Sequence, residues 1–414
     1  MANGHTLLDA VCEAPDDDGP RLIYADLLDE RGDPRGEFIR VQLALAKLPP
    51  ADPRRPELIA REKELLDDHR DEWLAPFRRL VSAAEFRRGF VEDVKVSVWH
   101  FVAFADALFA TGPVRRAHLL DIHPAEGLRV LQVVLESPHV ARLTGLTITN
   151  TRLGEPLART LATAPGLAGL KSLDMTRNEL GDGGAAELAS GSCLGSLEEL
   201  DLTGNEIGGQ GAEALANARH WSRLRRLTLN QNAAGSTGAV RVAGTDSLPK
   251  LDRLELAGNR VGDRLAETPN PSALLRVSRL DLSDNGLTAD GVQLVLADSV
   301  AAGVRYLDLS HNPLGDAGVA VLAESPHAAG LHTLRLSHAR VRNAGVVALA
   351  RSPYLSRLTA LDLSNNPIGE EGGQALLASK ELPQLRRLVM PAIGLSIKVR
   401  LALTAKYARG PVEC

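Results

Sequence analysis

The chain has 414 residues, of which 44% are apolar and 3% aromatic, so we expect two domains or an elongated array with an aliphatic core. A formal net charge of −5 favours neither a nucleic-acid partner nor a membrane surface. The three cysteines, Cys12, Cys193 and Cys414, are far apart, which excludes a disulfide framework and a cysteine metal site.

Charge is divided unevenly along the chain. Residues 1–94 contain 14 Lys and Arg against 21 Asp and Glu, a net charge of −7, and the remaining residues contain 33 against 31, a net of +2. The start has no basic segment followed by an apolar run, and no stretch approaches the roughly 18 apolar residues of a membrane span. We therefore expect a cytoplasmic protein without a signal peptide.

The N-terminal part is predicted to be a small all-α domain over residues 1–88. Start signals at Asp18-Gly19 and Asp33 and a proline-rich link at 49–56 separate helical patterns. The expected helices cover residues 6–14, 20–31, 34–48 and 57–73.

Residues 89–142 are interpreted as degenerate first repeats of an array. The segment from Phe90 to Val98 alternates between apolar and polar residues like a strand, and another strand is expected at Leu120 and Ile122. Between them we expect a helix whose buried face carries Phe101, Phe104, Ala105 and Leu108. Terminal units of a repeat array need atypical faces to shield the end of the core.

A motif of the form L-x-x-L-x-L-x-x-N-x-L-G, with L any aliphatic residue, then recurs along the chain. Its Asn positions are separated by 27, 27, 27, 26, 27 and 54 residues, and the 54-residue interval contains a repeat with Ala339 at that position. Thr151 and Ile393 extend the array by one unit at each end. The Asn residues are Asn178, Asn205, Asn232, Asn259, Asn285, Asn312 and Asn366.

Each part of the motif has a physical role. The L-x-L segment predicts a short strand with one buried face, and stacked units predict a parallel sheet. We expect the Asn amide to bond the backbone of its own and neighbouring turns. The second half of each unit predicts a helix, with Asp182, Asp290 and Asp316 placed as N-caps. Prolines between Thr268 and Pro271 interrupt one of these helices.

These features predict an α/β solenoid over residues 89–394, closed by a capping helix and tail over residues 395–414. The helix should cover residues 395–408, with Lys398, Arg400, Lys406 and Arg409 in water.

A 27-residue unit of strand, Asn turn and helix resembles the ribonuclease-inhibitor-like class of leucine-rich repeats. The resemblance covers about residues 115–395 and implies a curved solenoid with a concave sheet and convex helices. Segments of the first 88 residues, from Leu7 to Glu30 and from Glu37 to Gln42, resemble the bacterial repeat-companion domain found ahead of such repeats. Leu27 stands where that family often has Trp, at a position expected to lie in the core.

Two columns of residues should line the concave face, because equivalent positions stack about 5 Å apart on neighbouring strands. The middle residue of L-x-L gives a mainly acidic column, and the residue two positions earlier gives an Arg-rich one. The usual strand of this repeat class already contains L-D-L-S, so a single Asp carries little information. The predicted partner-binding residues are Asp174, Glu199, Asp201, Arg226, Arg253, Glu255, Arg279, Asp281, Tyr306, Asp308, Arg335 and Asp362.

A further column at the mouth of the strands contains Asp284, His311, His338 and Asn365. Two imidazoles beside a carboxylate could bind a divalent metal, but exposed polar side chains without a ligand are the preferred interpretation. The sequence contains no phosphate-binding loop, nucleophile elbow or H-E-x-x-H motif. We therefore expect no catalytic residue, cofactor or metal.

The sequence favours a monomeric, non-enzymatic scaffold that binds a protein partner on the concave sheet. An alternative is a regulator of an enzyme, because this repeat class is shared with ribonuclease inhibitors and Ran GTPase-activating proteins. The solenoid is neither cysteine-rich nor strongly acidic like those inhibitors, and rim residues of an activator are not identifiable. A structural, self-assembling element is the third possibility.

Overall fold

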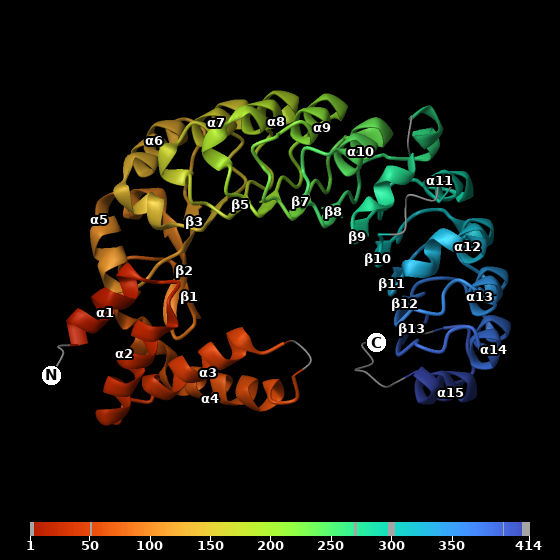
Figure 1. The fold of residues 1–414 in the computed structure, drawn as a ribbon, viewed down its shortest axis with the longest axis horizontal. Coiled ribbons are helices and arrows are strands. Elements are labelled where there is room, and N and C mark those ends of the chain that lie inside the picture. The colour runs from red at the N-terminus through yellow and green to blue at the C-terminus, as the bar shows by residue number, and fades with distance from the viewer. Residues whose placement is uncertain (1–3, 50–51, 269–270, 297–302, 392, 408–414) are drawn as a thin grey trace. The chain divides into compact units, whose positions relative to one another are not determined.

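The computed structural model describes residues 4–49, 52–268, 271–296, 303–391 and 393–407, and Figure 1 shows their fold. The chain forms two compact units, one of Met1–Thr151 with Thr163–Asp174 and the other of Arg152–Ala162 with Met175–Cys414. Within the described ranges, every helix is too short or too polar to cross a membrane.

The first unit begins with α1 to α4, as predicted, and continues with strands and helices in alternation. Strands β2 to β5 are parallel neighbours in chain order, whereas β1 pairs antiparallel with β2. Strand β1 therefore corrects the expectation that the first 88 residues are wholly helical. The helices are α1 (Gly4–Glu13), α2 (Asp18–Glu30), α3 (Arg35–Lys47), α4 (Arg55–Leu74), α5 (Val98–Thr111) and α6 (Gly127–Glu136). The strands are β1 (Ala83–Arg87), β2 (Phe90–Ser97), β3 (Arg116–Leu120), β4 (Gly145–Ile148) and β5 (Ser172–Asp174).

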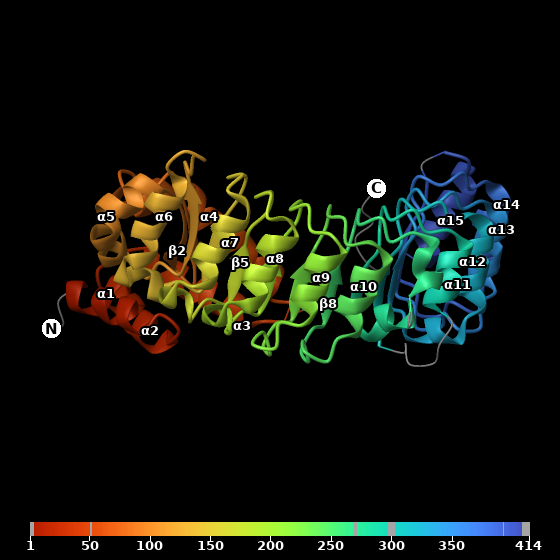
Figure 2. The same cartoon turned by 90° about the horizontal axis from the view of Figure 1, so that it is seen from above.

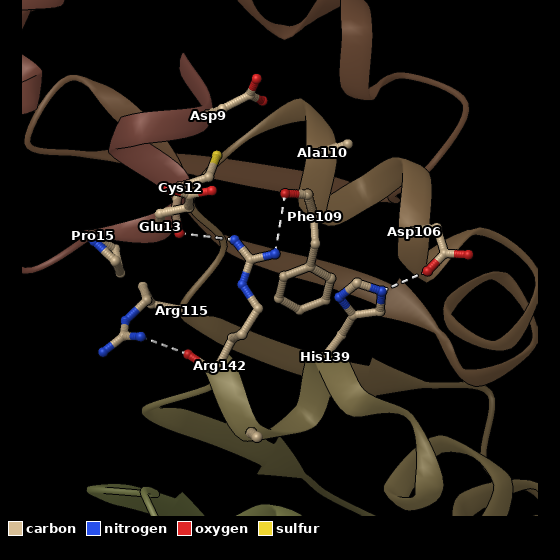
Figure 3. A pocket seen from close by; sticks show the side chains of 11 residues that line it. Asp9, Cys12, Glu13, Pro15, Asp106, Phe109, Ala110, Arg115, His139 and Arg142 are labelled. Atoms are coloured by element: carbon tan, nitrogen blue, oxygen red, sulfur yellow. Dashed lines mark hydrogen bonds and ion pairs between the residues drawn. The ribbon is translucent and has the colours of Figure 1, made fainter. Parts of the chain in front are cut away.

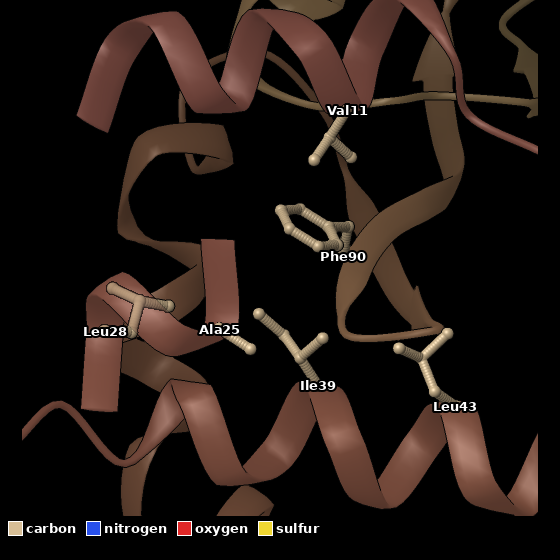
Figure 4. Close-up of a cluster of buried hydrophobic side chains, with 6 residues drawn as sticks. All are labelled: Val11, Ala25, Leu28, Ile39, Leu43 and Phe90. Carbon is tan, nitrogen blue, oxygen red and sulfur yellow. The ribbon is translucent and has the colours of Figure 1, made fainter. Parts of the chain in front are cut away.

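The N-terminal helices pack on the first repeat strands through a shared apolar cluster (Figure 4). Phe90 of β2 lies among side chains from α1, α2 and α3, including Ile39. Gly89 allows this close approach, because a Cβ atom there would lie 2.4 Å from Ile39 Cγ1 and its φ is +87°. The cluster consists of Val11, Ala25, Leu28, Ile39, Leu43 and Phe90.

Two predicted core positions in the first unit are wrong or only partly right. Helix α5 is kinked at Phe104, where φ is −133°, and the ring is 44% exposed while Phe101 and Leu108 are buried. The kink rotates Phe104 off the face that the helical spacing assigned to the core. Leu27 is half-buried and contributes little to the core.

The second unit consists of repeated strand–helix pairs. Its strands are parallel neighbours in chain order, and in Figure 1 strands β7 to β13 line the inner side of this unit's bend. The helices lie on the outer side, next to one another in chain order (Figure 2). The strands are β6 (Glu199–Asp201), β7 (Arg226–Thr228), β8 (Arg253–Glu255), β9 (Arg279–Asp281), β10 (Tyr306–Asp308), β11 (Thr333–Arg335), β12 (Ala360–Asp362) and β13 (Arg387–Val389). The helices are α7 (Gly154–Ala162), α8 (Gly181–Ser190), α9 (Gly209–Ala216), α10 (Gly235–Gly244), α11 (Ala289–Val295), α12 (Gly315–Glu324), α13 (Asn343–Ala350), α14 (Glu370–Ala378) and α15 (Ile397–Tyr407).

The Asn residues of the motif form a buried hydrogen-bonded ladder, as predicted. Asn205 is fully buried; its side-chain oxygen accepts from the Asn178 N–H at 2.8 Å, and its amide nitrogen donates to the Met175 carbonyl at 2.8 Å. Asn232 repeats the pattern with Asn205 and the Leu202 carbonyl. Each Asn therefore connects the turn of its own repeat to the preceding one.

None of the three Asp residues caps its own helix as expected, and two of them bind the start of the helix in the next repeat. Asp182 lies inside the first turn of α8, and its carboxylate accepts from Gly208 N–H at 2.7 Å and Gly211 N–H at 2.8 Å, at the start of α9. Asp316 does the same for α13, in the repeat after its own. In α11 the N-cap is Thr288 and not Asp290. The capping carboxylates thus stabilise the helix of the following repeat.

One repeat lacks an α-helix in the part that the structure describes, as the prolines predicted, and a helix lies near the C-terminus where one was expected. Among its described residues, the repeat after Val261 has the 3-10 turns η5 (Asp263–Glu267) and η6 (Pro271–Arg276) in place of an α-helix. Helix α15 closes the unit, and Lys406 Nζ, expected in water, donates to the Leu376, Leu377 and Ser379 carbonyls that end α14. Arg409 and the tail lie outside the described residues.

Candidate functional site

The non-helical face of β6 to β13, here called the polar sheet face, carries two rows of side chains set by the strand register. In β6 to β12 the central residue, such as Leu254 in β8, is buried, and the two flanking residues point to the other side. The predicted columns are therefore real cross-strand rows in this unit; Asp174 lies in β5, at the end of the first unit's sheet. The first row is Glu199, Arg226, Arg253, Arg279, Tyr306, Thr333, Ala360 and Arg387. The second row is Asp201, Thr228, Glu255, Asp281, Asp308, Arg335, Asp362 and Val389.

Strands β8 and β9 bring like charges directly opposite one another. Arg253 pairs in register with Arg279, and Glu255 pairs with Asp281. Like charges at directly opposite positions destabilise a sheet, whereas exchanging one Arg with one acid would have produced two favourable cross-strand pairs. We call these four residues the charge square.

The basic side of the charge square is only partly neutralised. Arg226 on the adjacent strand donates to Glu255 at 2.8 Å, and the Arg279 guanidinium lies over the Tyr306 ring at 3.6 Å from its centroid. Arg253 is exposed, and its side chain has no hydrogen bond or ion pair with any residue that the structure describes. Its guanidinium is therefore available to a ligand.

On the acidic side of the charge square, Glu255 is paired with Arg226, whereas Asp281 has no ion pair with any described residue. Asp281 is half-buried, and its carboxylate accepts from Ser283 N–H at 2.9 Å. Burial raises the pKa of Asp281, and the neighbouring carboxylates of Asp308 and Glu255 raise it further. A cation supplied by a partner would relieve this repulsion.

The four Asp carboxylates of the second row have a structural role that the sequence analysis did not recognise. Asp201, Asp281, Asp308 and Asp362 each accept from the backbone N–H two residues later, at 2.9 to 3.0 Å. This contact is the Asx turn that ends each strand, and the Ser or Thr two residues after the Asp is its sequence signal. These Asp residues therefore stabilise the turn whether or not they also bind a partner.

A hollow of about 310 Å³ opens on the same face over β10 to β13. It forms where the small side chains of Thr333 and Ala360 lie between Tyr306 and Arg387 in the first row. Beneath it, Arg335 is 3.2 Å from Asp308 and 3.5 Å from Asp362.

The turn column of Asp284, His311, His338 and Asn365 occupies left-handed backbone positions, with φ of 54 to 60°. The His311 and His338 rings stack, with centroids 4.4 Å apart, and Ser337 Oγ lies 3.1 Å from His338 Nδ1. Among the described residues, no group of three or more His, Cys, Asp or Glu side chains is arranged to hold a metal ion. The geometry explains the polar residues at these positions by the turn itself.

A second hollow, of about 660 Å³, lies in the first unit beside α1 and α5 (Figure 3). Arg142 crosses it and donates to the carbonyls of Cys12 at 3.0 Å and Phe109 at 3.4 Å. His139 stacks on Phe109 and lies 2.6 Å from Asp106. Burial raises the pKa of the Cys12 thiol, so it stays protonated at neutral pH. These contacts connect α1 to the repeats and do not form a recognisable reactive site.

Comparison with known proteins supports the repeat architecture. A family model described as leucine-rich repeat matches residues 170–189, 196–216, 277–296, 304–323 and 355–377. No curated protein matches the sequence.

Two similar solved structures have low sequence identity to this chain and low TM-scores. One is an internalin, InlF, from Listeria monocytogenes strain 4b F2365, with 16% identity and a TM-score of 0.46 over 77% of this chain and 94% of the internalin. Another is TLR13 in its complex with ssRNA13, with 16% identity and a TM-score of 0.43 over 72% of this chain and 43% of that chain. The present chain thus spans less than half of the TLR13 chain. The matched segments are leucine-rich repeats, and the parallel strands with their outer helices form a leucine-rich-repeat-like solenoid, a fold typical of protein–protein interaction modules.

Proposed function

We propose that this chain is a non-enzymatic scaffold that binds a protein partner on the polar sheet face of β6 to β13. The observation that carries the proposal is the charge square, in which Arg253 faces Arg279 and Glu255 faces Asp281. These two like-charge pairings cost the fold stability, because like charges directly opposite one another repel. Residues that oppose stability in this way are expected where a surface serves a ligand.

The rest of the face suits a macromolecular partner better than a small molecule. It spans eight strands, and its hollow over β10 to β13 is open and only about 310 Å³. Protein interfaces combine such a depression, which receives an anchoring side chain, with surrounding charges that select the partner and speed association. Tyr306 and Arg335 at the hollow belong to residue types that are enriched in interfaces.

The test is affinity capture from a lysate of the source cell with the intact chain and with Arg253→Glu. The Arg253 side chain makes no hydrogen bond or ion pair with a described residue, so its reversal should leave the fold intact and weaken capture by about tenfold or more. Arg219→Glu is the matched control, because Arg219 is exposed and lies outside both rows. A partner captured equally by all three proteins would refute the proposed surface.

We further propose that the repeats belong to the ribonuclease-inhibitor-like class and that residues 1–88 form a repeat-companion domain. The 27-residue period and the α-helix in most repeats support the first assignment. The helices α1 to α4 at the expected positions support the second.

A further inference from the structure

The charges of the polar sheet face are segregated into two short lines that run across the strands. The first row has Arg226, Arg253 and Arg279 on consecutive strands β7 to β9. The second row has Glu255, Asp281 and Asp308 on consecutive strands β8 to β10. A ligand that satisfies both lines must present a line of negative groups beside a line of positive groups.

The repeat spacing decides which backbone can present such lines. Neighbouring strands lie about 4.8 Å apart, so the charges of one line recur at about this interval. An α-helix lying across the strands offers one residue per turn every 5.4 Å, which differs by about 0.6 Å per repeat. In an extended segment, residues on the same side recur only about every 6.6 Å. This spacing exceeds the distance between neighbouring strands by nearly 2 Å per repeat. Over three strands, long side chains can absorb the helical mismatch but not the extended one.

The distance between the two lines also matches a helix. Arg253 and Glu255 are two residues apart in one strand, so the lines are separated by about 6.6 Å. Two adjacent stripes on a helix are about 100° apart, and at a side-chain radius near 5 Å this places them about 8 Å apart. The flexible ends of Lys and Glu side chains close this difference.

We propose that the partner segment recognised here is an α-helix with adjacent acidic and basic stripes, lying across β7 to β10. The acidic stripe contacts Arg253 and Arg279, and the basic stripe contacts Glu255 and Asp281. This inference rests on the proposed binding function of the same face. A nucleic-acid backbone is disfavoured as the occupant, because its phosphates would suit the Arg line and be repelled by the carboxylate line.

The test uses three synthetic peptides of about 20 residues, long enough to form helix when a side-chain crosslink on the far face holds them. The striped peptide carries Glu on one stripe and Lys on the adjacent stripe. The interleaved peptide has the same composition, but Glu and Lys alternate within each stripe. A third peptide has the striped sequence but no crosslink, and a Pro at its centre breaks the helix. Binding to the full chain is measured by fluorescence anisotropy at low and high salt.

The striped helix should bind at least about tenfold more tightly than the other two peptides, and Arg253→Glu should remove this preference while Arg219→Glu should not. The preference should also decrease as salt is raised, because the Arg253 side chain is exposed and salt screens its attraction to the acidic stripe. Equal affinities for the three peptides, or no binding of the striped helix, would overturn the proposal.

The capture experiment separates this inference from the proposed function. The capture of a cellular partner could depend on Arg253 while the three peptides bind equally well. That result would support the binding face and contradict the helical ligand. If Arg253→Glu changes neither the capture of the partner nor the binding of the striped peptide, the proposed binding face and the helical ligand are both wrong.

Discussion

The guanidinium of Arg21 on α2 lies 2.6 Å from the carboxylate of Glu92 on β2, and the two side chains are 0% and 6% exposed. Arg21 also donates to the Pro15 and Arg88 carbonyls, at 2.8 and 3.1 Å, and Arg88 donates to Glu92 at 3.1 Å. This buried network joins the N-terminal helices to the first repeat strands, next to the apolar cluster around Phe90.

Removing one partner of that ion pair should strongly destabilise the first unit. Arg21→Ala leaves the buried Glu92 carboxylate without its nearest cation, which should lower the free energy of unfolding by about 3–5 kcal/mol. Arg40→Ala is the comparison, because Arg40 pairs with Asp26 and Asp29 at the surface and should cost about 1 kcal/mol or less. Chemical denaturation measures both, and similar losses for the two variants would contradict the prediction.

The Asn ladder can be tested by removing one member and by adding a missing one. Asn259→Ala leaves the Leu229 carbonyl and the Ala234 N–H without this buried partner, which should cost about 2–4 kcal/mol. Ala339 interrupts the ladder, and the N–H of Asn312 donates to no residue that the structure describes. Ala339→Asn should therefore raise the free energy of unfolding by about 1 kcal/mol. A destabilised Ala339→Asn would show that this repeat has no room for the amide.

Because Asp182 binds the start of the helix in the next repeat, its substitution should destabilise that helix and not its own. Asp182→Ala should cost about 1–2 kcal/mol, and its effect should appear in α9 and not in α8. Hydrogen exchange of the Gly208 and Gly211 amides should accelerate, while the amides of α8 stay protected. Asp290→Ala is the matched control, because Asp290 also lies in a first turn but accepts no hydrogen bond from the next repeat among the described residues.

The charge square predicts a pH-dependent gain of stability on neutralising Asp281. Burial and the neighbouring carboxylates raise the pKa of Asp281 in the folded state, so the folded state holds this proton more tightly than the unfolded state. The intact chain therefore loses stability as pH rises from the unfolded pKa of the group through its folded pKa.

Asp281→Asn keeps the oxygen that accepts from Ser283 and lacks this loss. The variant should be more stable than the intact chain at pH 7, by up to about 1 kcal/mol, and the advantage should shrink toward pH 4. Thermal melts at both pH values measure this stability difference. The control is Asp246→Asn, because the Asp246 side chain is 93% exposed. An Asp281→Asn advantage that grows as pH falls would contradict the assigned pKa direction.

Much of the repeat architecture is readable from the sequence, because a fixed period of 27 residues also fixes the strand register. Arg253 and Glu255 pair with Arg279 and Asp281 because the motif recurs at this point after 26 residues, one fewer than in the neighbouring repeats. The buried Asn ladder follows as well, since an amide at the same point of every repeat has only neighbouring turns to bond.

Other features depend on contacts that no local pattern contains. An Asp near the start of a helix looks like an N-cap, and only the stacking of repeats shows that Asp182 serves α9. Phe104 has the spacing of a core residue, but a kink in α5 exposes it. Strand β1 has weak alternation and is recognisable only through its antiparallel pairing with β2.

The two kinds of contact between repeats point in opposite directions along the chain. The Asn205 side chain serves the preceding turn, through the Asn178 N–H, whereas the Asp182 side chain serves the following helix, through the Gly208 N–H. A single repeat is therefore chemically incomplete on both sides, and a cut within the array exposes unsatisfied groups on each new end. Adding or deleting a whole unit restores both sets of bonds, but a shift of a few residues breaks both. The length of such an array can change only in steps of one repeat.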